Sequence, residues 1–162
     1  MSMTKRILMI VFVLVACVGC DQATKSLAEA YLTETEVQSF LGDTLRLQLA
    51  HNTGAFLSLG ANLPEAWREG IFSTGTAALL LVLLAFSLFS KSATTLEIEA
   101  YSLFLAGGAG NLIDRVMCGY VVDFMNVGIG PLRTGIFNVA DIAVTFAVFV
   151  LVADSLRKRK GL

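Results

Sequence analysis

The stretch Gly135-Ile136-Phe137-Asn138-Val139-Ala140-Asp141-Ile142-Ala143-Val144 places an asparagine and an aspartate at the start of an apolar run that continues to Val152. This run is long enough to enter a lipid bilayer, where a carboxylate is costly and usually functional. A second aspartate, Asp123, precedes Asp141 by eighteen positions. The rest of the sequence predicts that these two carboxylates meet.

The composition is that of an integral membrane protein. The chain has 162 residues, of which 56% are hydrophobic and only 15% charged, and its mean hydropathy is strongly positive. A soluble domain of this length carries more charge and fewer apolar residues. The net charge of −1 indicates no nucleic-acid partner.

Four apolar segments predict an all-α membrane protein with four transmembrane helices, in a single integral membrane domain that covers residues 1–162. The spans are expected at about 7–26, 70–90, 96–116 and 136–152. Basic residues lie before the first span, in the turn between spans two and three, and after the last span. The positive-inside rule therefore places both termini in the cytoplasm, and segments 27–69 and 117–134 outside.

The outer segments contain little regular structure by sequence pattern. Thr44–Leu49 alternates polar and apolar residues, which is typical of a strand with one apolar face. Asn62-Leu63-Pro64-Glu65 has the cap, early proline and early acid of a helix start, so a short outer helix is expected there. Residues 117–134 are expected to form a loop.

The N-terminal run allows other interpretations. Leu14-Val15-Ala16-Cys17 has the form of a lipoprotein processing site, so the chain could itself be a lipoprotein that is cleaved before Cys17 or Cys20. The helical pattern that continues past Asp21 favours a membrane span instead. Cys17 and Cys20 could also form a redox or metal pair. No histidine or further cysteine lies near them, which favours an interpretation as small buried hydrophobic residues.

Polar residues mark one end of three of the predicted spans. On the expected topology, the ends of spans one and three and the start of span four all lie at the outer face of the membrane. The residues are Asp21, Lys25, Asn111, Asp114, Arg115, Asn138 and Asp141. Asp21 with Lys25, Asn111 with Asp114, and Asn138 with Asp141 are spaced so that each pair shares a helix face, which predicts one site at the outer boundary of the hydrocarbon region.

Carboxylates are the acid–base groups available to this site. Two aspartates close together in poorly hydrated surroundings share a proton, so one can activate water while the other protonates the reacting group. Asp123 and Asp141 are the candidates for this pair. Asp21 with Lys25, and Asp114 with Arg115, are expected to form structural ion pairs. No metal or organic cofactor is expected. A small transporter or proton relay that uses the same acids is an alternative.

Five ordered motifs carry a resemblance to a known family. They are Asp21-Gln22-Ala23-Thr24-Lys25, Asn52-Thr53-Gly54-Ala55-Phe56, Gly108-Ala109-Gly110-Asn111-Leu112-Ile113-Asp114-Arg115, Val121-Val122-Asp123-Phe124 and Phe137-Asn138-Val139-Ala140-Asp141. Together they resemble lipoprotein signal peptidase (signal peptidase II) over nearly the whole chain.

The resemblance implies a four-helix aspartic endopeptidase of the bacterial inner membrane, with its site near the periplasmic face. It implies cleavage of diacylglyceryl-modified prolipoproteins just before the lipidated cysteine, contact with membrane lipid, and binding of the cyclic-peptide inhibitors of the family. Asp123 and Asp141 match the catalytic pair. The polar residues that support the site in this family correspond to Asp21, Lys25, Asn52, Gly54, Asn111, Arg115 and Asn138. The family also implies a small periplasmic strand cradle and a short periplasmic helix within residues 40–67.

Overall fold

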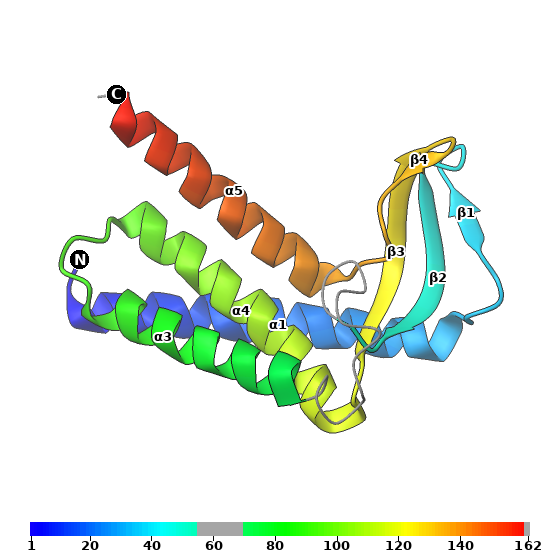
Figure 1. The fold of residues 1–162 in the computed structure, drawn as a ribbon, viewed down its shortest axis with the longest axis horizontal. Coiled ribbons are helices and arrows are strands. Elements are labelled where there is room, and N and C mark those ends of the chain that lie inside the picture. The colour runs from blue at the N-terminus through cyan, green and yellow to red at the C-terminus, as the bar shows by residue number, and fades with distance from the viewer. Residues whose placement is uncertain (55–69, 161–162) are drawn as a thin grey trace.

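In the part of the chain that the structure describes, the fold consists of four α-helices and a four-stranded antiparallel sheet that lies across one end of them (Figure 1). The computed structural model describes residues 1–54 and 70–160. The elements in chain order are α1 (Met3–Tyr31), β1 (Gln38–Phe40), β2 (Leu45–Asn52), a short π-helical turn η2 (Gly70–Thr74), α3 (Gly75–Phe89), α4 (Thr95–Cys118), β3 (Val121–Ile129), β4 (Leu132–Arg133) and α5 (Val139–Arg159). The outer helix that was expected to start at Asn62-Leu63-Pro64-Glu65 lies outside the described residues.

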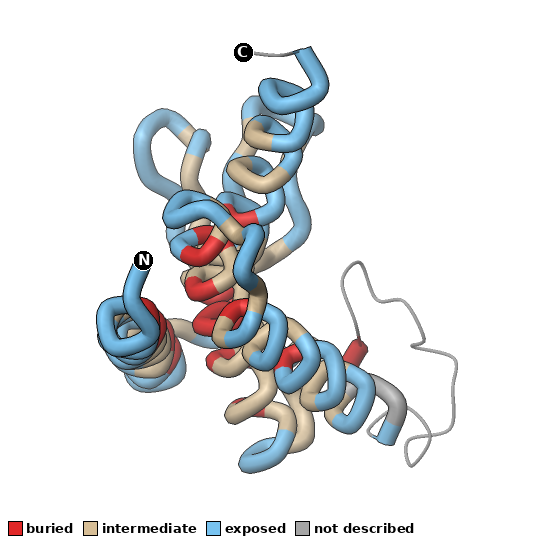
Figure 2. Tube along the Cα trace, turned by 90° about the vertical axis from the view of Figure 1, so that its left-hand side faces the viewer, coloured by how far each residue is buried: buried red, intermediate tan, exposed pale blue. Residues whose placement is uncertain are grey.

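The outer surface of the helices is apolar. Among the described residues, α1 and α5 are long and apolar enough to cross a membrane, and α3 is a shorter apolar helix. Large side chains such as Phe12, Phe89 and Phe149 are exposed on these helices. Figure 2 shows that the buried residues lie on the sides of the helices that face one another. An apolar exterior around a partly polar interior is the arrangement of a membrane protein.

Local sequence sets the ends of the two helices nearest the site. Thr94 and Glu97 form a capping box at the start of α4, and Gly119 ends that helix with a left-handed conformation at φ 82°. Asn138 and Asp141 form a second capping box at the start of α5. The two polar residues of the opening stretch therefore define where α5 begins.

α4 is the central helix and contacts α1, α3 and α5. Glycines on α4 allow the other helices to come close. A Cβ atom added at Gly107 would meet the carbonyl oxygen of Ala140 on α5, and one at Gly108 would lie 2.6 Å from Leu80 on α3. Close packing therefore requires glycine at both positions, Gly107 at the interface with α5 and Gly108 at the interface with α3.

The sheet confirms the strand cradle that the resemblance implied, but it is larger than expected. Its strand order is β1-β2-β3-β4. The expected strand at 44–49 corresponds to β2, but the expected loop at 117–134 is wrong, because it contains β3 and β4. The pairing of β2 with β3 shifts register between Leu47 and Ala50, after which Ala50 lies opposite Asp123. The residues of β3 from Val121 to Phe124 are buried, so they lack the polar–apolar alternation of a half-exposed strand.

The interpretation of the cysteine pair as buried hydrophobic residues is also wrong. Cys17 is only partly buried and Cys20 is exposed. Both lie within α1, which continues as one helix through this region to Tyr31. On an apolar membrane helix such positions face lipid, which accepts a thiol as readily as a protein interior does.

Replacing Gly107 with alanine is expected to lower stability, because the added Cβ forces α4 and α5 apart. An overpacking cost of about 1–3 kcal/mol in the free energy of unfolding is expected, measured by thermal unfolding in detergent. Gly19→Ala is the matched control, because Gly19 on α1 has nothing within 4 Å of its added Cβ. Its unfolding temperature is expected to equal or exceed that of the wild type. Equal values for the two variants would contradict this account of the α4–α5 interface.

Candidate active site

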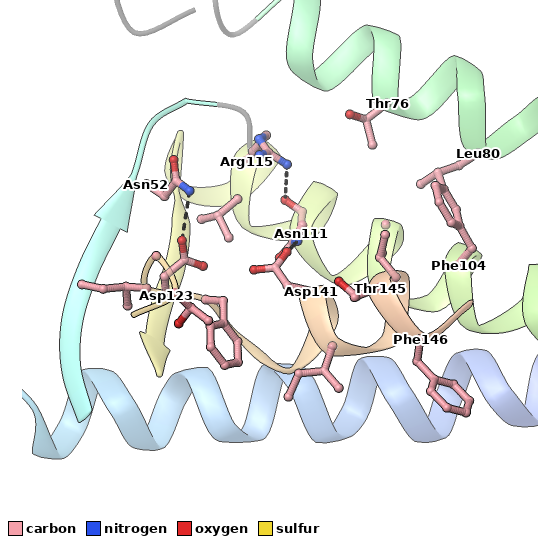
Figure 3. Close-up of a pocket in the computed structure, with 18 of the residues that line it drawn as sticks. Asn52, Thr76, Leu80, Phe104, Asn111, Arg115, Asp123, Asp141, Thr145 and Phe146 are labelled. Atoms are coloured by element: carbon pink, nitrogen blue, oxygen red, sulfur yellow. Dashed lines mark hydrogen bonds between the residues drawn. The ribbon is translucent and has the colours of Figure 1, made fainter. Parts of the chain in front are cut away.

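Asp123 and Asp141 lie at the junction between the sheet and the helices. Asp123 belongs to β3, and Asp141 belongs to the first turn of α5. Both line one cavity of about 1050 Å³, together with Asn52, Asn111 and Arg115. Figure 3 shows the two carboxylates next to each other, Asp123 from the strand and Asp141 from the helix. The structure therefore brings together the two acids that were predicted to meet.

Asp123 is buried and is held by two amide side chains. Asn52 Nδ2 donates to its Oδ2 at 3.0 Å, and Asn138 Nδ2 donates to its Oδ1 at 2.7 Å. The pKa of Asp123 is raised to about 6, chiefly by burial and also by the negative charge of Asp141, although the hydrogen bonds from Asn52 and Asn138 act to lower it. Asp123 therefore keeps its proton at a pH where an exposed aspartate has lost it.

Asp141 is fixed by the start of its own helix. Its Oδ2 accepts from the backbone N–H of Asn138 at 3.2 Å, and its Oδ1 accepts from Asn111 Nδ2 at 2.8 Å. In return, the backbone N–H of Asp141 donates to Asn138 Oδ1 at 2.9 Å. The amino-terminal end of α5 also favours a negative charge at this position.

Asn138 connects the two carboxylates. It is completely buried, and its Nδ2 atom lies within hydrogen-bond distance of Asp123 Oδ1, the Val122 carbonyl and Asn111 Oδ1. Its Oδ1 caps α5, as described above. A single amide therefore fixes the position of the strand carboxylate relative to the helix that carries the other carboxylate.

Lys25 lies between two further carboxylates. Its Nζ atom is 2.8 Å from Asp21 and 2.8 Å from Asp114, and it donates to Asn111 Oδ1 at 2.9 Å. The expected Asp21–Lys25 pair is present. The expected pairing of Asp114 with Arg115 is wrong, because adjacent residues on a helix point in different directions and the partner of Asp114 is Lys25.

The two partners of Lys25 hold the backbones that carry the candidate pair. Asp21 Oδ1 accepts from the backbone N–H of Ala140 at 2.9 Å, one residue before Asp141. Asp114 Oδ2 accepts from the backbone N–H of Val122 at 3.1 Å, one residue before Asp123. These carboxylates thus position α5 and β3 without entering the cavity.

Arg115 and Gly54 complete the predicted set. Arg115 donates through Nη2 to the Gly54 carbonyl at 3.2 Å, and the Gly54 N–H donates to Asn52 Oδ1 at 3.0 Å. This bond orients the amide of Asn52 so that its Nδ2 points at Asp123. All nine residues that the sequence singled out for the site therefore belong to one connected region.

Two features of the site were missed by sequence reasoning. Gln22 donates to Asp114 Oδ1 at 2.8 Å and to the Gly110 carbonyl at 3.3 Å. Its position in the sequence between Asp21 and Lys25, two predicted site residues, could have indicated its role. The apolar part of the cavity was also missed, because its residues come from ordinary membrane-helix sequence. They include Leu80, Phe104, Phe146 and Phe149.

The part of the chain that the structure describes holds no group of three His, Cys, Asp or Glu side chains arranged to bind a metal ion. The space between Asp21 and Asp114 is filled by the ammonium group of Lys25. The site therefore contains the buried carboxyl group of Asp123, with a raised pKa, and a second carboxylate, Asp141, in the same cavity.

Comparison with known proteins identifies the family. The sequence model of the family described as "Signal peptidase (SPase) II" matches residues 13–157. The chain belongs to the signal peptidase II family. It is 34% identical over 146 residues to the lipoprotein signal peptidase of Francisella tularensis subsp. novicida, covering 88% of each chain. It is 31% identical over 160 residues to the lipoprotein signal peptidase of a Sulfurihydrogenibium species, covering 98% of this chain and 97% of the relative.

Solved structures agree with the assignment. One bacterial membrane enzyme matches with a TM-score of 0.81 and 28% identity, over 98% of this chain and 91% of that chain. Another matches with a TM-score of 0.78 and 29% identity, over 95% of this chain and 94% of that chain. The family is that of the aspartic peptidases that cleave the signal peptides of prolipoproteins, and the chain is a hydrolase of this class.

Replacing Asn52 with alanine is expected to raise the pKa of Asp123 above its value of about 6, because a donor that stabilises the ionised carboxylate is lost. The titration can be followed by carboxyl ¹³C NMR of aspartate-labelled protein in detergent. Asn126→Ala is the control, since its side chain bonds to the segment around Thr134 and to Arg133; it should leave the titration unchanged. An Asp123 titration that is identical in wild type and Asn52→Ala would contradict the role of Asn52.

Proposed function

We propose that Asp123 and Asp141 are the catalytic pair with which this signal peptidase hydrolyses the bond just before the lipidated cysteine of diacylglyceryl-modified prolipoproteins. The observation that carries the proposal is that both carboxylates line one cavity and accept hydrogen bonds from Asn138, Asp123 from its side chain and Asp141 from its backbone N–H. The raised pKa of Asp123 supports a division of labour in which the two acids differ in protonation.

In this mechanism Asp123 begins protonated and Asp141 begins ionised. Asp141 takes a proton from a water molecule as the water oxygen attacks the scissile carbonyl carbon. Asp123 gives its proton to the carbonyl oxygen, which produces a tetrahedral intermediate with two hydroxyl groups. When the C–N bond breaks, Asp141 passes its proton to the leaving nitrogen and Asp123 regains a proton from a hydroxyl group, so both acids return to their starting state.

The supporting residues act by position. Asn52, Asn111 and Asn138 hold the carboxylates with hydrogen bonds, and Arg115 with Gly54 orients Asn52. Asp21 and Lys25 fix the start of α5 through the Ala140 N–H. Holding both acids in place before substrate arrives lowers the cost of reaching the transition state.

The cavity walls fit a substrate that carries lipid. Beyond the carboxylates the lining is apolar and is contributed by α3, α4 and α5, with Leu80, Phe104 and Phe149 among its residues. Acyl chains of a diacylglyceryl group are stabilised by such walls, while the peptide bond lies beside the acids. The cyclic-peptide inhibitors of the family are expected to occupy the same cavity.

The position of the polar network supports a topology for the chain. α1, α3, α4 and α5 are proposed to span the bacterial inner membrane, with the site near the periplasmic face and both termini in the cytoplasm. The sheet lies at one end of the helices, and the N- and C-terminal ends lie at the other (Figure 1). Basic residues lie in the last turn of α5 and directly after it, which supports a cytoplasmic location for that end and contact with anionic head groups. Water can then reach the acids from the periplasm.

Asp141→Asn and Asp123→Asn are each expected to lower cleavage by about 10³-fold, because one step of proton transfer is lost. The assay is cleavage of a diacylglyceryl lipopeptide by purified protein, with a cyclic-peptide inhibitor to identify background. Asp154→Asn is the matched control. Asp154 pairs with Lys158 at the opposite end of α5, and its variant should cleave at the wild-type rate. Normal turnover by either dyad variant would refute the assignment.

The pH dependence of kcat/KM is expected to fall above pH about 6, because Asp123 must be protonated and its pKa in the free enzyme is about 6. Asn52→Ala, which raises this pKa, should move the decline to higher pH even though it also lowers the maximal rate. Rates measured across the pH range with one lipopeptide test both points. A decline that keeps the same midpoint in wild type and Asn52→Ala would exclude Asp123 as the proton donor.

A further inference from the structure

The wall that α5 contributes to the cavity carries a single hydroxyl group in apolar surroundings. Among residues 142–152 the sequence has one polar side chain, that of Thr145. Thr145 lines the cavity together with Phe146 and Phe149. Figure 3 shows its side chain on α5 beside that of Asp141. The hydroxyl group therefore lies in a part of the cavity wall that the proposed mechanism does not use.

The hydroxyl group of Thr145 is available to a molecule in the cavity. A hydroxyl inside a helix can donate to the carbonyl oxygen one turn earlier in the same helix. Ser87 Oγ donates in this way to the Leu83 carbonyl at 2.7 Å. Ser102 Oγ donates to the Ile98 carbonyl at 2.6 Å. Thr145 is exposed, and its hydroxyl takes part in none of the side-chain hydrogen bonds among the residues that the structure describes.

The position of Thr145 along α5 is fixed relative to Asp141. The two residues are four apart, so they share one side of the helix and are separated by about 6 Å along its axis. α5 begins at the sheet and runs toward the basic C-terminal end (Figure 1). Thr145 therefore lies one turn farther from the sheet than Asp141, in the direction in which the cavity becomes apolar.

A diacylglyceryl group carries its own polar groups at a corresponding distance from the scissile bond. Its two ester groups lie between the cysteine sulfur and the acyl chains. An ester carbonyl oxygen accepts hydrogen bonds and cannot donate them, so an uncharged hydroxyl donor suits it. Against a wholly apolar wall this oxygen would lose its hydrogen bonds to water without replacement, which is costly. One hydroxyl removes that cost while the rest of the wall contacts the acyl chains.

We propose that Thr145 is a specificity-determining residue, whose hydroxyl donates a hydrogen bond to an ester carbonyl oxygen of the substrate's diacylglyceryl group. The inference rests on the proposed function, because it takes a diacylglyceryl-modified prolipoprotein as the substrate. The cysteine side chain and the glycerol carbons join the scissile bond to the esters through single bonds. This linkage is long and flexible enough to place a carbonyl oxygen one helical turn from Asp141. Thr145 then favours cysteines that carry ester-linked lipid.

Two lipopeptides with chains of equal length test the inference. One carries a diacylglyceryl group and the other a dialkylglyceryl group, in which ether CH₂ groups replace the ester carbonyls. The wild type is expected to cleave the diacyl lipopeptide with a kcat/KM about fivefold higher, the effect of one neutral hydrogen bond. Thr145→Val removes the hydroxyl, keeps the branched shape, and should lower this ratio to about one. Thr145→Ser should retain the ratio of the wild type.

Thr95→Val is the matched control. It makes the same substitution at an exposed position in the first turn of α4, outside the cavity, and it should retain the ratio of the wild type. The two lipopeptides are compared within each variant, so a change in the amount of folded protein cancels.

Three results would overturn the inference. One is a ratio that is the same in the wild type and Thr145→Val. Another is equal loss of the ratio in Thr145→Val and Thr145→Ser, because the methyl group would then be responsible. The third is loss of the ratio in Thr76→Val alone, which would assign the contact to α3, where Thr76 lines the cavity. Failure of the proposed function would be recognised separately, as wild-type cleavage of both lipopeptides by Asp141→Asn.

Discussion

The site depends on one buried cation. The side chain of Lys25 is 3% exposed and lies between the carboxylates of Asp21 and Asp114. Those carboxylates hold the backbone one residue before each member of the proposed catalytic pair. Without the ammonium group, two uncompensated charges would remain in a dry interior, and loss of one partner from such a pair typically costs about 3–5 kcal/mol. The same ion therefore stabilises the helix interface and fixes the positions of α5 and β3.

The groups that touch the pair directly are neutral amides. Asn52, Asn111 and Asn138 donate hydrogen bonds to the carboxylates without adding positive charge. A lysine or arginine at these positions would favour ionisation of both acids, whereas the proposed reaction requires one to keep its proton. Lys25 donates to Asn111, which in turn donates to Asp141. The charge that stabilises the fold is thus separated by an amide from the acids whose protonation must vary.

The sequence predicted the helices and the residues of the site better than it predicted the structure between them. Apolar length and the clustering of polar residues at helix ends identified the four helices and the meeting of Asp123 with Asp141. β3 was missed because its first residues are buried on both sides and lack alternation. The predicted partner of Asp114 was wrong. Arg115 is its neighbour in the sequence but points in a different direction on the helix, and the actual partner is Lys25 on α1. Arg6 was interpreted only as a topology signal, yet it is buried and donates to the Ser87, Leu88 and Ser90 carbonyls at the end of α3.

The separation between the two acids is set by a short piece of chain. Phe137 pairs with Met125 of β3 through backbone hydrogen bonds in both directions, each of 2.8 Å. The next residue, Asn138, caps α5 and bonds to Asp123. The chain therefore leaves the sheet and begins the helix within one residue, so α5 cannot shift along β3 without breaking these contacts. Movement of the sheet would therefore carry the first turn of α5 with it, and with it the carboxylate of Asp141.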